Sequence, residues 1–379
     1  MRLRTFRNFH DEVVEFPPEG AALIGPNGQG KTNLIEAIYY LEVFRSFRGA
    51  NDDQLIGFGA DHFRVEGRLE GEGGEEVVAA AYARSSRRKK VTVDGTEPER
   101  LSDAIGRVGA VVFAASDVEI VNGGPGARRR FLDILLSLVE PGYLASLQRY
   151  RQTVAQRNEL LRDGASGPRL RAWDAGLVEH GSRLMEWRGR WFAAYARTFA
   201  ECYAAVSGGE RAGMAYDPSV AASGDLEQDT SVDDAGAPER GVFATAFHDA
   251  LERVGERERR RGVTLVGPHR DDARFWAEAE PEPVDLRAYG SAGQQRTAAI
   301  ALRMTEALTL RAARGRPPIV MLDDVFAELD PARAERVLEL SGRQEWGQVI
   351  VTSPKPNEFA RLGGRLNAYD VSRGRVRPS

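Results

Sequence analysis

Apolar and polar residues divide the chain into strand-like and helix-like stretches. Short continuous apolar runs predict strands that are buried on both faces, at residues 21–24, 109–113, 319–322 and 349–351. Residues 33–41 follow the first of these runs with the apolar spacing of a helix. Residues 1–9 alternate charged and apolar side chains, which predicts an edge strand. Strands followed by helices in this order indicate an α/β fold.

A strand-like period of two returns within the first hundred residues. Residues 75–82 and 90–95 both show it, and the polar stretch Ser85-Ser86-Arg87-Arg88 lies between them. We therefore predict an antiparallel hairpin here, with a second turn at Asp94-Gly95.

Between residues 128 and 203 the apolar period changes to that of a helix. Pro141-Gly142 and the stretch 163–168 interrupt the apolar stripes, so the pattern predicts a helical lobe with a short antiparallel helix pair. Residues 242–261 predict a further helix, and residues 219–240 before it read as an acidic loop.

The composition is that of a soluble globular protein, with 379 residues of which 42% are apolar and 28% charged. This length favours two lobes over one. The single cysteine, Cys202, excludes an intrachain disulfide and a cysteine-based zinc site. No stretch approaches 18 uncharged apolar residues, so we expect a cytoplasmic protein without a membrane span.

The strongest motif lies between the first buried strand and its helix. Residues 25–32 read GPNGQGKT and match the phosphate-binding loop GxxxxGK[ST] in full. Glycine allows positive φ and brings backbone N–H groups close to phosphate oxygens. Lys31 reaches the β and γ phosphates, and Thr32 offers its hydroxyl to Mg²⁺. ATP with Mg²⁺ is the predicted cofactor, bound by Gly25, Pro26, Asn27, Gly28, Gln29, Gly30, Lys31 and Thr32.

A second acidic motif follows the buried strand at residues 319–322. Asp323 and Asp324 stand at its carboxyl end, where ligands collect in open α/β sheets. We predict that Asp323 holds Mg²⁺ through water and that Asp324 polarises the water that attacks the γ phosphate. Asp330-Pro331 then has the form of an N-cap and first helical residue.

A third motif opens the helix that precedes this strand. Residues 289–296 read YGSAGQQR, with Ser291 as the predicted N-cap of a helix that ends at Gly315. Unpaired N–H groups in a first helical turn form an anion site, to which Ser291, Gly293 and Gln294 are the candidate contributors. Alone, this motif would be no more than a helix cap.

Together, these motifs resemble those of the ABC-type ATPases: the Walker A loop at 25–32, the signature at 291–294, the Walker B strand end at 323–324 and the D-loop at 328–330. In that superfamily two nucleotide domains pair head to tail. The resemblance implies that Ser291 contacts the γ phosphate of ATP bound to the other copy. It makes Lys31, Asp324 and Ser291 the expected catalytic residues.

Several further stretches resemble the RecF family of bacterial recombination mediators over nearly the whole chain. They are residues 122–125, 128–133, 156–158, 160–161, 173–174, 267–272 and 323–330. This resemblance implies an ABC-type ATPase head with an inserted helical lobe, divided as residues 1–118 and 262–379 for the head and 119–261 for the lobe. It also implies an ATP-dependent homodimer that binds DNA at gaps or single-stranded regions and hydrolyses ATP weakly under the influence of DNA. With RecO and RecR, such a protein would assist the loading of RecA during repair and SOS induction.

The chain departs from the ABC transporters at three points. Asp324 replaces the usual glutamate after the Walker B aspartate. Thr352-Ser353 follows the strand at 349–351 where a switch histidine is usual, and Ala114-Ala115-Ser116 stands where a Q-loop glutamine is usual. The γ-phosphate sensor is therefore not identified by sequence. His269 fits either an acid–base residue or a residue that fixes a loop.

DNA contacts must come from local basic patches, because the formal net charge is −4. Arginine makes up all but four of the 52 basic residues, and codon usage in a GC-rich genome explains such a bias equally well. Two runs are the candidate phosphate contacts: Arg87, Arg88, Lys89 and Lys90 at the hairpin, and Arg128, Arg129 and Arg130 at a helix start. Each run would also suit a solvated surface. Recognition of DNA backbone and shape, without base reading, is expected.

Two other classes compete with this prediction. A transport ATPase subunit would share the nucleotide motifs but would dock on membrane proteins. A structural clamp of the SMC type would need long coiled coils, for which the helical stripes are too short.

Overall fold

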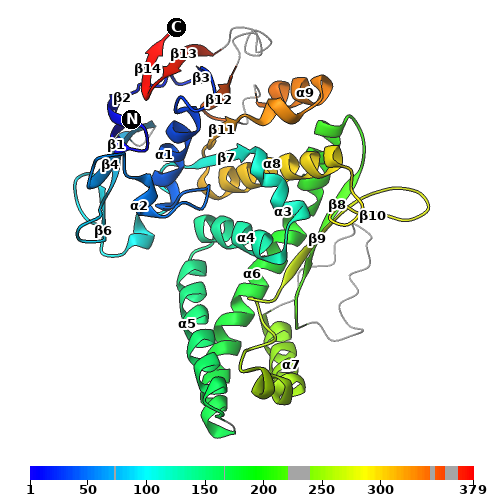
Figure 1. The fold of residues 1–379 in the computed structure, drawn as a ribbon. Helices are drawn as coiled ribbons and strands as arrows, with labels where there is room; N and C mark the ends of the chain where they lie inside the picture. Colours follow the sequence, from blue (N-terminus) through cyan, green and yellow to red (C-terminus); the bar gives the residue numbers. More distant parts are fainter. Residues whose placement is uncertain (72–73, 166, 221–239, 342–345, 355–365) are drawn as a thin grey trace. The chain divides into compact units, whose positions relative to one another are not determined.

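The structure is a computed structural model that describes all residues except 72–73, 166, 221–239, 342–345 and 355–365. The chain forms two compact units (Figure 1). Unit 1 comprises Met1–Asp117 and Glu306–Ser379, and unit 2 comprises Val118–Thr305. The predicted acidic loop at 219–240 lies almost wholly outside the described residues.

Unit 1 contains a six-stranded sheet in the order β14-β13-β3-β12-β11-β7. Its strands are β3 (Gly20–Ile24), β7 (Ala110–Ala114), β11 (Ile319–Asp323), β12 (Val349–Ser353), β13 (Asn367–Ser372) and β14 (Arg375–Pro378). All neighbours are parallel except β13 and β14. The four apolar runs predicted as strands are confirmed as β3, β7, β11 and β12.

A second, antiparallel sheet of unit 1 has the order β2-β1-β4-β5-β6. Its strands are β1 (Arg2–Phe6), β2 (Phe9–Val13), β4 (His62–Gly71), β5 (Gly74–Ala83) and β6 (Arg88–Val93). The predicted hairpin is the β5–β6 pair, and Asp94 and Gly95 adopt the positive φ of 50° and 80° that its second turn requires. The edge-strand prediction for residues 1–9 is wrong: the chain reverses at Arg7, so β1 lies between β2 and β4.

Helix α1 (Lys31–Val43) packs against strands of both sheets, and its buried residues belong to one hydrophobic cluster with both. Two carboxylates on this helix are fully buried and paired. Glu36 accepts bidentate hydrogen bonds from Arg7 at 2.8 and 3.0 Å, and Glu42 accepts from Arg314 at 2.8 Å and from the backbone N–H of Gly109 at 2.7 Å. Charge pairing thus allows an almost entirely buried helix to keep two acidic residues.

Apart from α1 and the end of α8, the helices among the described residues of unit 1 are short. They are α2 (Asp52–Leu55), α9 (Pro331–Ser341) and the 3₁₀ turns Leu101–Asp103, Ala115–Asp117 and Val325–Glu328. Asp330 caps α9, because its Oδ1 accepts from the Arg333 N–H at 3.0 Å. The predicted N-cap and first helical residue are confirmed here.

Unit 2 is mainly helical. Its elements are α3 (Val118–Asn122), α4 (Pro125–Val139), α5 (Tyr143–Arg162), α6 (Pro168–Ser207), β8 (Ala212–Asp217), α7 (Arg240–Arg261), β9 (Asp272–Ala277) and β10 (Val284–Asp285), with strand order β10-β9-β8. Figure 1 shows α5 and α6 as an antiparallel pair, as predicted. Gly142 makes the turn before α5 with φ 87°. Helix α8 (Ala292–Arg314) starts in unit 2 and ends in unit 1.

The division differs from the predicted one at its second boundary. The first boundary, at Asp117, lies one residue from the expected position. Residues 262–305 were expected in the head, but they belong to unit 2. The reason is that β9 pairs along its whole length with β8, and Asp272 forms an ion pair with Arg128 of α4 at 2.5 Å.

Candidate functional site

The loop at residues 25–32 joins β3 to α1 in unit 1. Its glycines Gly25, Gly28 and Gly30 have positive φ of 156°, 80° and 120°. A Cβ on Gly25 would lie 2.2 Å from the carbonyl oxygen of Val371, and one on Gly30 would lie 2.7 Å from the Asn8 side chain. The positive φ favours glycine at both positions, and at Gly25 the close approach of the Val371 backbone excludes a side chain as well.

Two turns of unit 1 hold this loop from outside. The Gln29 carbonyl accepts from Asn8 Nδ2 at 2.8 Å and from the Gly374 N–H at 3.2 Å. The Gln29 side-chain Oε1 accepts from the Arg373 N–H at 2.8 Å. The Gln29 side chain thus fixes the loop to the β13–β14 turn.

Lys31 is buried at the base of the loop. Its Nζ donates to the carbonyl oxygens of Gly25 at 2.5 Å and Pro26 at 3.1 Å. Burial lowers the pKa of this ammonium, while the charges of Asp324 and Asp323 oppose that shift. A buried cation in a glycine-rich loop, close to two carboxylates that can hold a metal ion, suits the binding of a nucleotide phosphate with Mg²⁺.

Asp323 is held by hydroxyl groups from two other elements. Its Oδ1 accepts from Thr32 Oγ1 at 2.9 Å and from Thr352 Oγ1 at 3.1 Å. Burial raises the pKa of this carboxyl, the two hydroxyl donors lower it, Asp324 raises it and Arg48 lowers it. The strand end, the phosphate loop and β12 therefore meet at one carboxylate.

Asp324 leaves the strand in a left-handed conformation, with φ 52° and ψ 29°. Its N–H donates to Thr352 Oγ1 at 2.9 Å. Left-handed φ is uncommon for a residue other than glycine and marks a constrained position. The constraint fixes the direction in which the backbone turns after Asp323.

Thr352 was not among the predicted site residues, because we sought an imidazole at this point. Its hydroxyl donates to Asp323 and accepts from the Asp324 N–H, so it joins both aspartates. A signal was present in the sequence. Parallel neighbouring strands end at the same edge of a sheet, so the residue that ends the apolar run of β12 had to lie beside Asp323.

Thr32 and Asp323 present hard oxygen ligands of the kind that Mg²⁺ prefers. Their oxygens lie 2.9 Å apart, at the mouth of a loop that is shaped for phosphates. Two protein oxygens, with waters and phosphate oxygens, fit the usual magnesium site beside a nucleotide. These residues therefore fit the predicted metal.

Ser291 lies in unit 2, at the start of α8, and is exposed. Its N–H donates to Gln294 Oε1 at 3.0 Å, and its Oγ accepts from the Gln294 N–H at 3.2 Å. This reciprocal capping box confirms Ser291 as the N-cap. It also directs the Gln294 side chain toward its own helix end. Ser291 and the phosphate loop belong to different compact units of the chain.

The candidate DNA contacts separate into structural and exposed residues. Arg128 is 2% exposed; it donates to three backbone carbonyls of residues 120–123 and pairs bidentately with Asp272, so it does not reach DNA in this fold. Lys89 donates to the Phe44 carbonyl at 2.6 Å and pairs with Asp52 at 3.0 Å. These two assignments are corrected: both cations hold the fold together.

The other candidate cations lie nearer the solvent. Arg88 and Lys90 are exposed and share Glu97, at 3.9 and 2.7 Å, and Arg87 and Arg130 are exposed. Arg129 is half-buried and donates to the Asp271 carbonyl at 2.7 Å. Exposed ion pairs contribute little stability, so Arg88 and Lys90 can exchange Glu97 for a phosphate at low cost.

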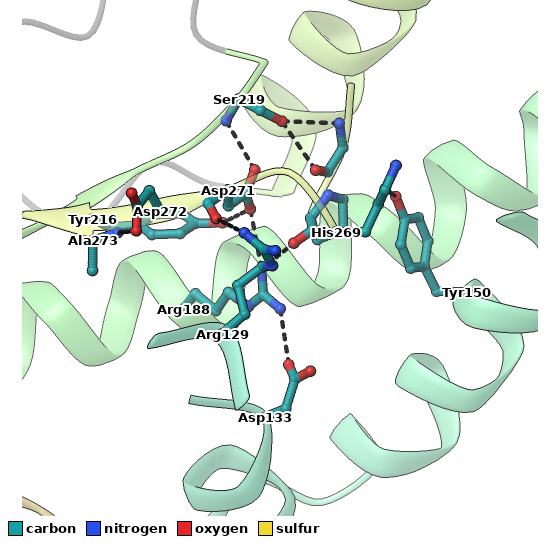
Figure 2. Close-up of polar contacts among 12 residues, drawn as sticks. Arg129, Asp133, Tyr150, Arg188, Tyr216, Ser219, His269, Asp271, Asp272 and Ala273 are labelled. Carbon is teal, nitrogen blue, oxygen red and sulfur yellow. Dashed lines mark hydrogen bonds and ion pairs between the residues drawn. The ribbon is translucent and has the colours of Figure 1, made fainter. Parts of the chain in front are cut away.

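Figure 2 shows a buried polar network in unit 2, centred on the loop at residues 267–272. Asp271 accepts from Tyr216, from Arg188 at 3.2 Å and from the Ser219 N–H at 2.8 Å. Arg188 in turn donates to Asp133 at 2.8 Å. Such a satisfied buried network fixes the loop against α4, α6 and β8.

His269 belongs to this loop, and both of its ring nitrogens have partners. Nδ1 lies 2.6 Å from Tyr150 Oη, and Nε2 lies 3.1 Å from the Thr264 carbonyl. A carbonyl only accepts, so Nε2 carries the proton and Nδ1 accepts from Tyr150. Burial lowers the pKa of His269 to about 4. Of the two roles left open by sequence, the geometry favours a residue that fixes the loop.

Known proteins resemble this chain over nearly its whole length. Residues 1–374 match the family described as RecF/RecN/SMC N terminal domain. The DNA replication and repair protein RecF of Synechococcus sp. (strain JA-3-3Ab) is 36% identical, over 100% of this chain and 97% of that protein. The chain belongs to the RecF family. The RecF of Halalkalibacterium halodurans is 38% identical, over 100% of this chain and 98% of that protein.

Solved structures of RecF and of an Smc head domain share the fold of this chain. The recombination mediator protein RecF of the RecFOR pathway, as RecF-ATP, has a TM-score of 0.86 and 27% identity, covering 100% of this chain and 96% of that one. An Smc head domain from Pyrococcus furiosus shares the fold, with a TM-score of 0.56 and 17% identity over 100% of this chain and 94% of that one. The RecF-family chain therefore has the head fold of ABC/SMC-type ATPases. Among its described residues, no helix is long and apolar enough to cross a membrane.

Proposed function

We propose that this RecF-family chain is an ATP-gated DNA-binding protein of recombinational repair and replication restart. The observation that carries the proposal is the convergence of Thr32, Asp323 and Thr352 beside the buried Lys31. Lysine, hydroxyl and carboxylate in this arrangement match the needs of a nucleoside triphosphate with its magnesium ion.

Within the proposed site each residue has a distinct task. Lys31 neutralises the β and γ phosphates, while Thr32 and Asp323 would hold Mg²⁺, which supplies charge neutralisation when it is bound. Asp324 accepts a proton from the attacking water. Because the Asp324 carboxylate is one methylene shorter than a glutamate, we expect slow turnover.

Ser291 completes the site in the partner molecule. By likeness to ABC-type ATPases, the capped turn before α8 meets the γ phosphate bound to a second copy. ATP would thus stabilise a homodimer, and hydrolysis would release it. We further propose that Arg87, Arg88, Lys90 and Arg130 contact the DNA backbone.

The wider assignments rest on the family. RecO and RecR as partners, RecA as the protein loaded afterwards, SOS induction and a cytoplasmic location are proposed for this chain on the grounds of its RecF relatives. Stimulation of hydrolysis by DNA belongs to the same proposal.

The test is fluorescence anisotropy of a labelled gapped duplex titrated with the protein, with and without ATP and Mg²⁺, at a fixed moderate salt concentration. Binding that requires ATP and Mg²⁺ is the expected result. Lys31→Met is the control variant, which should lose the ATP-dependent part of the binding. Equal affinity with and without nucleotide would refute gating, and no binding in either state would refute autonomous DNA contact.

A further inference from the structure

Three helix ends meet at one place in unit 2, where a buried arginine holds them together. Arg157 of α5 donates to Glu258 of α7 at 2.7 Å and to Asp174 of α6 at 2.8 Å. It also donates to Thr264 Oγ1, just after α7, at 3.0 Å. Because Glu258 and Asp174 both pair with this buried cation, they do not neutralise charges at the surface. The ends of α5 and α7 and the start of α6 therefore form one fixed frame.

The segments next to this frame are packed as closely. Leu161, Ala165 and Leu170 form a small buried cluster that joins the end of α5 to the start of α6. A Cβ on Gly262, the residue after α7, would lie 3.0 Å from Cγ of Arg162 at the end of α5. The three helix ends are thus neighbours at the surface of unit 2.

Six exposed arginines, which we call the basic tip, belong to these three helix ends. They form no ion pair with any residue that the structure describes, and they are Arg162, Arg169, Arg171, Arg257, Arg259 and Arg261. The exposed carboxylates of Glu159 and Asp163 lie beside them in the sequence, which leaves a formal charge of +4 (6 − 2). Since the whole chain carries −4, this is a local concentration of positive charge.

Helix capping accounts for only part of the basic tip. Arg162, Arg259 and Arg261 lie in the last turns of their helices, where a cation meets the negative end of the helix dipole. Arg169 and Arg171 lie instead in the first turn of α6, whose N–H groups carry positive potential. Two cations at that end oppose the dipole, so the stability of the helix does not explain them. Their placement suits an anion from outside the chain.

An exposed aromatic ring adjoins the same turn of α6. Trp173 is 36% exposed and lies four residues after Arg169, a spacing at which side chains are neighbours on a helix surface. Proteins bind single-stranded nucleic acid by placing cations on its phosphates and aromatic rings against its bases. In a duplex the base faces are stacked on one another, so the ring would have no equivalent partner there.

We propose that the basic tip and Trp173 form a binding surface for single-stranded DNA. The surface lies wholly within unit 2 and adds to the proposed contacts at the hairpin of unit 1. Arg169 and Arg171 contact phosphates, and Trp173 stacks on an unpaired base. The inference rests on the proposed DNA-binding function and names the form of DNA that this part of the chain takes.

The test is fluorescence anisotropy of a labelled single-stranded oligothymidylate, titrated with the full chain in ATPγS and Mg²⁺ over a range of salt concentrations. Arg169→Gln/Arg171→Gln removes two phosphate contacts, each of which contributes about 0.7 to the slope of log affinity against log salt. The slope should become shallower by about 1.4, and the affinity at about 0.15 M salt should fall about 10-fold. Arg197→Gln/Arg211→Gln is the matched control. It removes the same charge from two exposed, ion-paired arginines of unit 2 and should leave binding unchanged.

The same variant separates binding from folding. Because the two cations oppose the dipole of α6, Arg169→Gln/Arg171→Gln should unfold at the same urea concentration as the wild type or at a higher one. A lower midpoint would show that these arginines serve the fold, and would overturn their assignment to DNA.

Trp173 is tested by the difference between single strands and duplex. Trp173→Leu keeps an apolar side chain but loses the stacking surface, so it should weaken binding of the single strand by about 5- to 100-fold. Its affinity for an unbroken duplex should stay at the wild-type level. Trp173→Phe should retain most of the affinity for the single strand, because it keeps a ring. Equal losses with both forms of DNA would contradict stacking on an unpaired base.

The outcomes separate the inference from the function beneath it. A wild-type chain that binds neither the single strand nor a gapped duplex overturns both. If the wild type binds the gapped duplex, but Arg169→Gln/Arg171→Gln and Trp173→Leu bind the single strand as tightly as the wild type does, the basic tip alone is overturned. An equal loss of affinity in the Arg197→Gln/Arg211→Gln control would reveal a general effect of charge and would overturn it as well.

Discussion

The hydroxyl of Thr352 gives the sharpest test of the proposed hydrolysis site. Thr352→Val keeps the shape of a side chain that is 1% exposed, but it removes the donor to Asp323 and the acceptor of the Asp324 N–H. A hydrogen bond to a charged group contributes about 1.5–3 kcal/mol, and an unsatisfied buried N–H costs about 1–3 kcal/mol. If about 1.4–2.8 kcal/mol of this loss falls on the transition state, turnover drops about 10- to 100-fold.

The pH dependence of the same variant has a defined sign. Burial already raises the pKa of Asp323, and the Thr352 hydroxyl is one of the groups that lower it. Its removal raises the pKa further, so the carboxyl becomes protonated at a higher pH. The ionised form is the one that binds Mg²⁺, so the acidic limb of the activity profile should move to higher pH. The Mg²⁺ concentration for half-maximal activity should rise as well.

The assay is steady-state phosphate release over a range of pH and Mg²⁺ concentrations, with Thr352→Ser as the control. Serine keeps the hydroxyl and should restore both the acidic limb and the Mg²⁺ requirement. Binding of ATP without Mg²⁺ should be similar in all three proteins. A Thr352→Val protein with wild-type turnover, acidic limb and Mg²⁺ requirement would show that the threonine does not support Asp323.

Three further changes test other parts of the structure. Asp324→Asn should lower the rate of phosphate release by at least about 100-fold, as loss of a general base does. The ATP-bound dimer should persist in sedimentation velocity. An unchanged rate of phosphate release would exclude Asp324 as the base. Arg128→Met should lower the free energy of unfolding by about 3–5 kcal/mol, because it removes the bidentate partner of Asp272, to which only Arg287 at 3.8 Å remains paired, and leaves three carbonyls without their donor. Arg87→Met should change it by less than about 0.5 kcal/mol. A stable Arg128→Met protein that binds DNA poorly would instead revive Arg128 as a DNA contact. The pKa of His269 is lowered to about 4, so between pH 6.5 and 4 the unfolded chain binds a proton that the folded chain does not. The free energy of unfolding should therefore fall by up to about 3 kcal/mol as the pH decreases through this window. Urea unfolding should show a smaller pH dependence for His269→Leu than for the wild type, and an equal pH dependence of both proteins would contradict a neutral buried imidazole.

Local patterns were enough to predict most of the fold and the elements that carry the candidate site. The phosphate loop, the strand that ends at Asp323 and the serine cap of α8 each depend on a few consecutive residues, and all three are found where the sequence placed them. Gln29 shows the limit of such reasoning. Its side chain bonds to Arg373, 344 residues away, and no local pattern specifies that contact.

The misplaced DNA contacts carried a signal that was overlooked. Arg128 lies three and seven residues before Phe131 and Leu135, so it shares the buried stripe of α4. Lys89 has the same strand parity as the buried Val91 of β6. In both runs the charges look equivalent in the sequence, but the helical or strand period assigns one of them to the interior. Their partners, Asp272 for Arg128 and Asp52 for Lys89, make that burial tolerable.

The second domain boundary depends on a pairing between distant strands, so no local pattern specifies it. The strand pairing of β9 with β8 places residues 262–305, and Ser291 with them, in the helical unit. In the proposed function, the phosphate loop of unit 1 binds the nucleotide, and Ser291 of unit 2 contacts the nucleotide bound to a second copy. One consequence is that nucleotide affinity and dimerisation can be altered separately. Ser291→Arg should bind ATP as a monomer with wild-type affinity and fail to dimerise, and a parallel loss of both properties would show that the serine supports the nucleotide of its own chain.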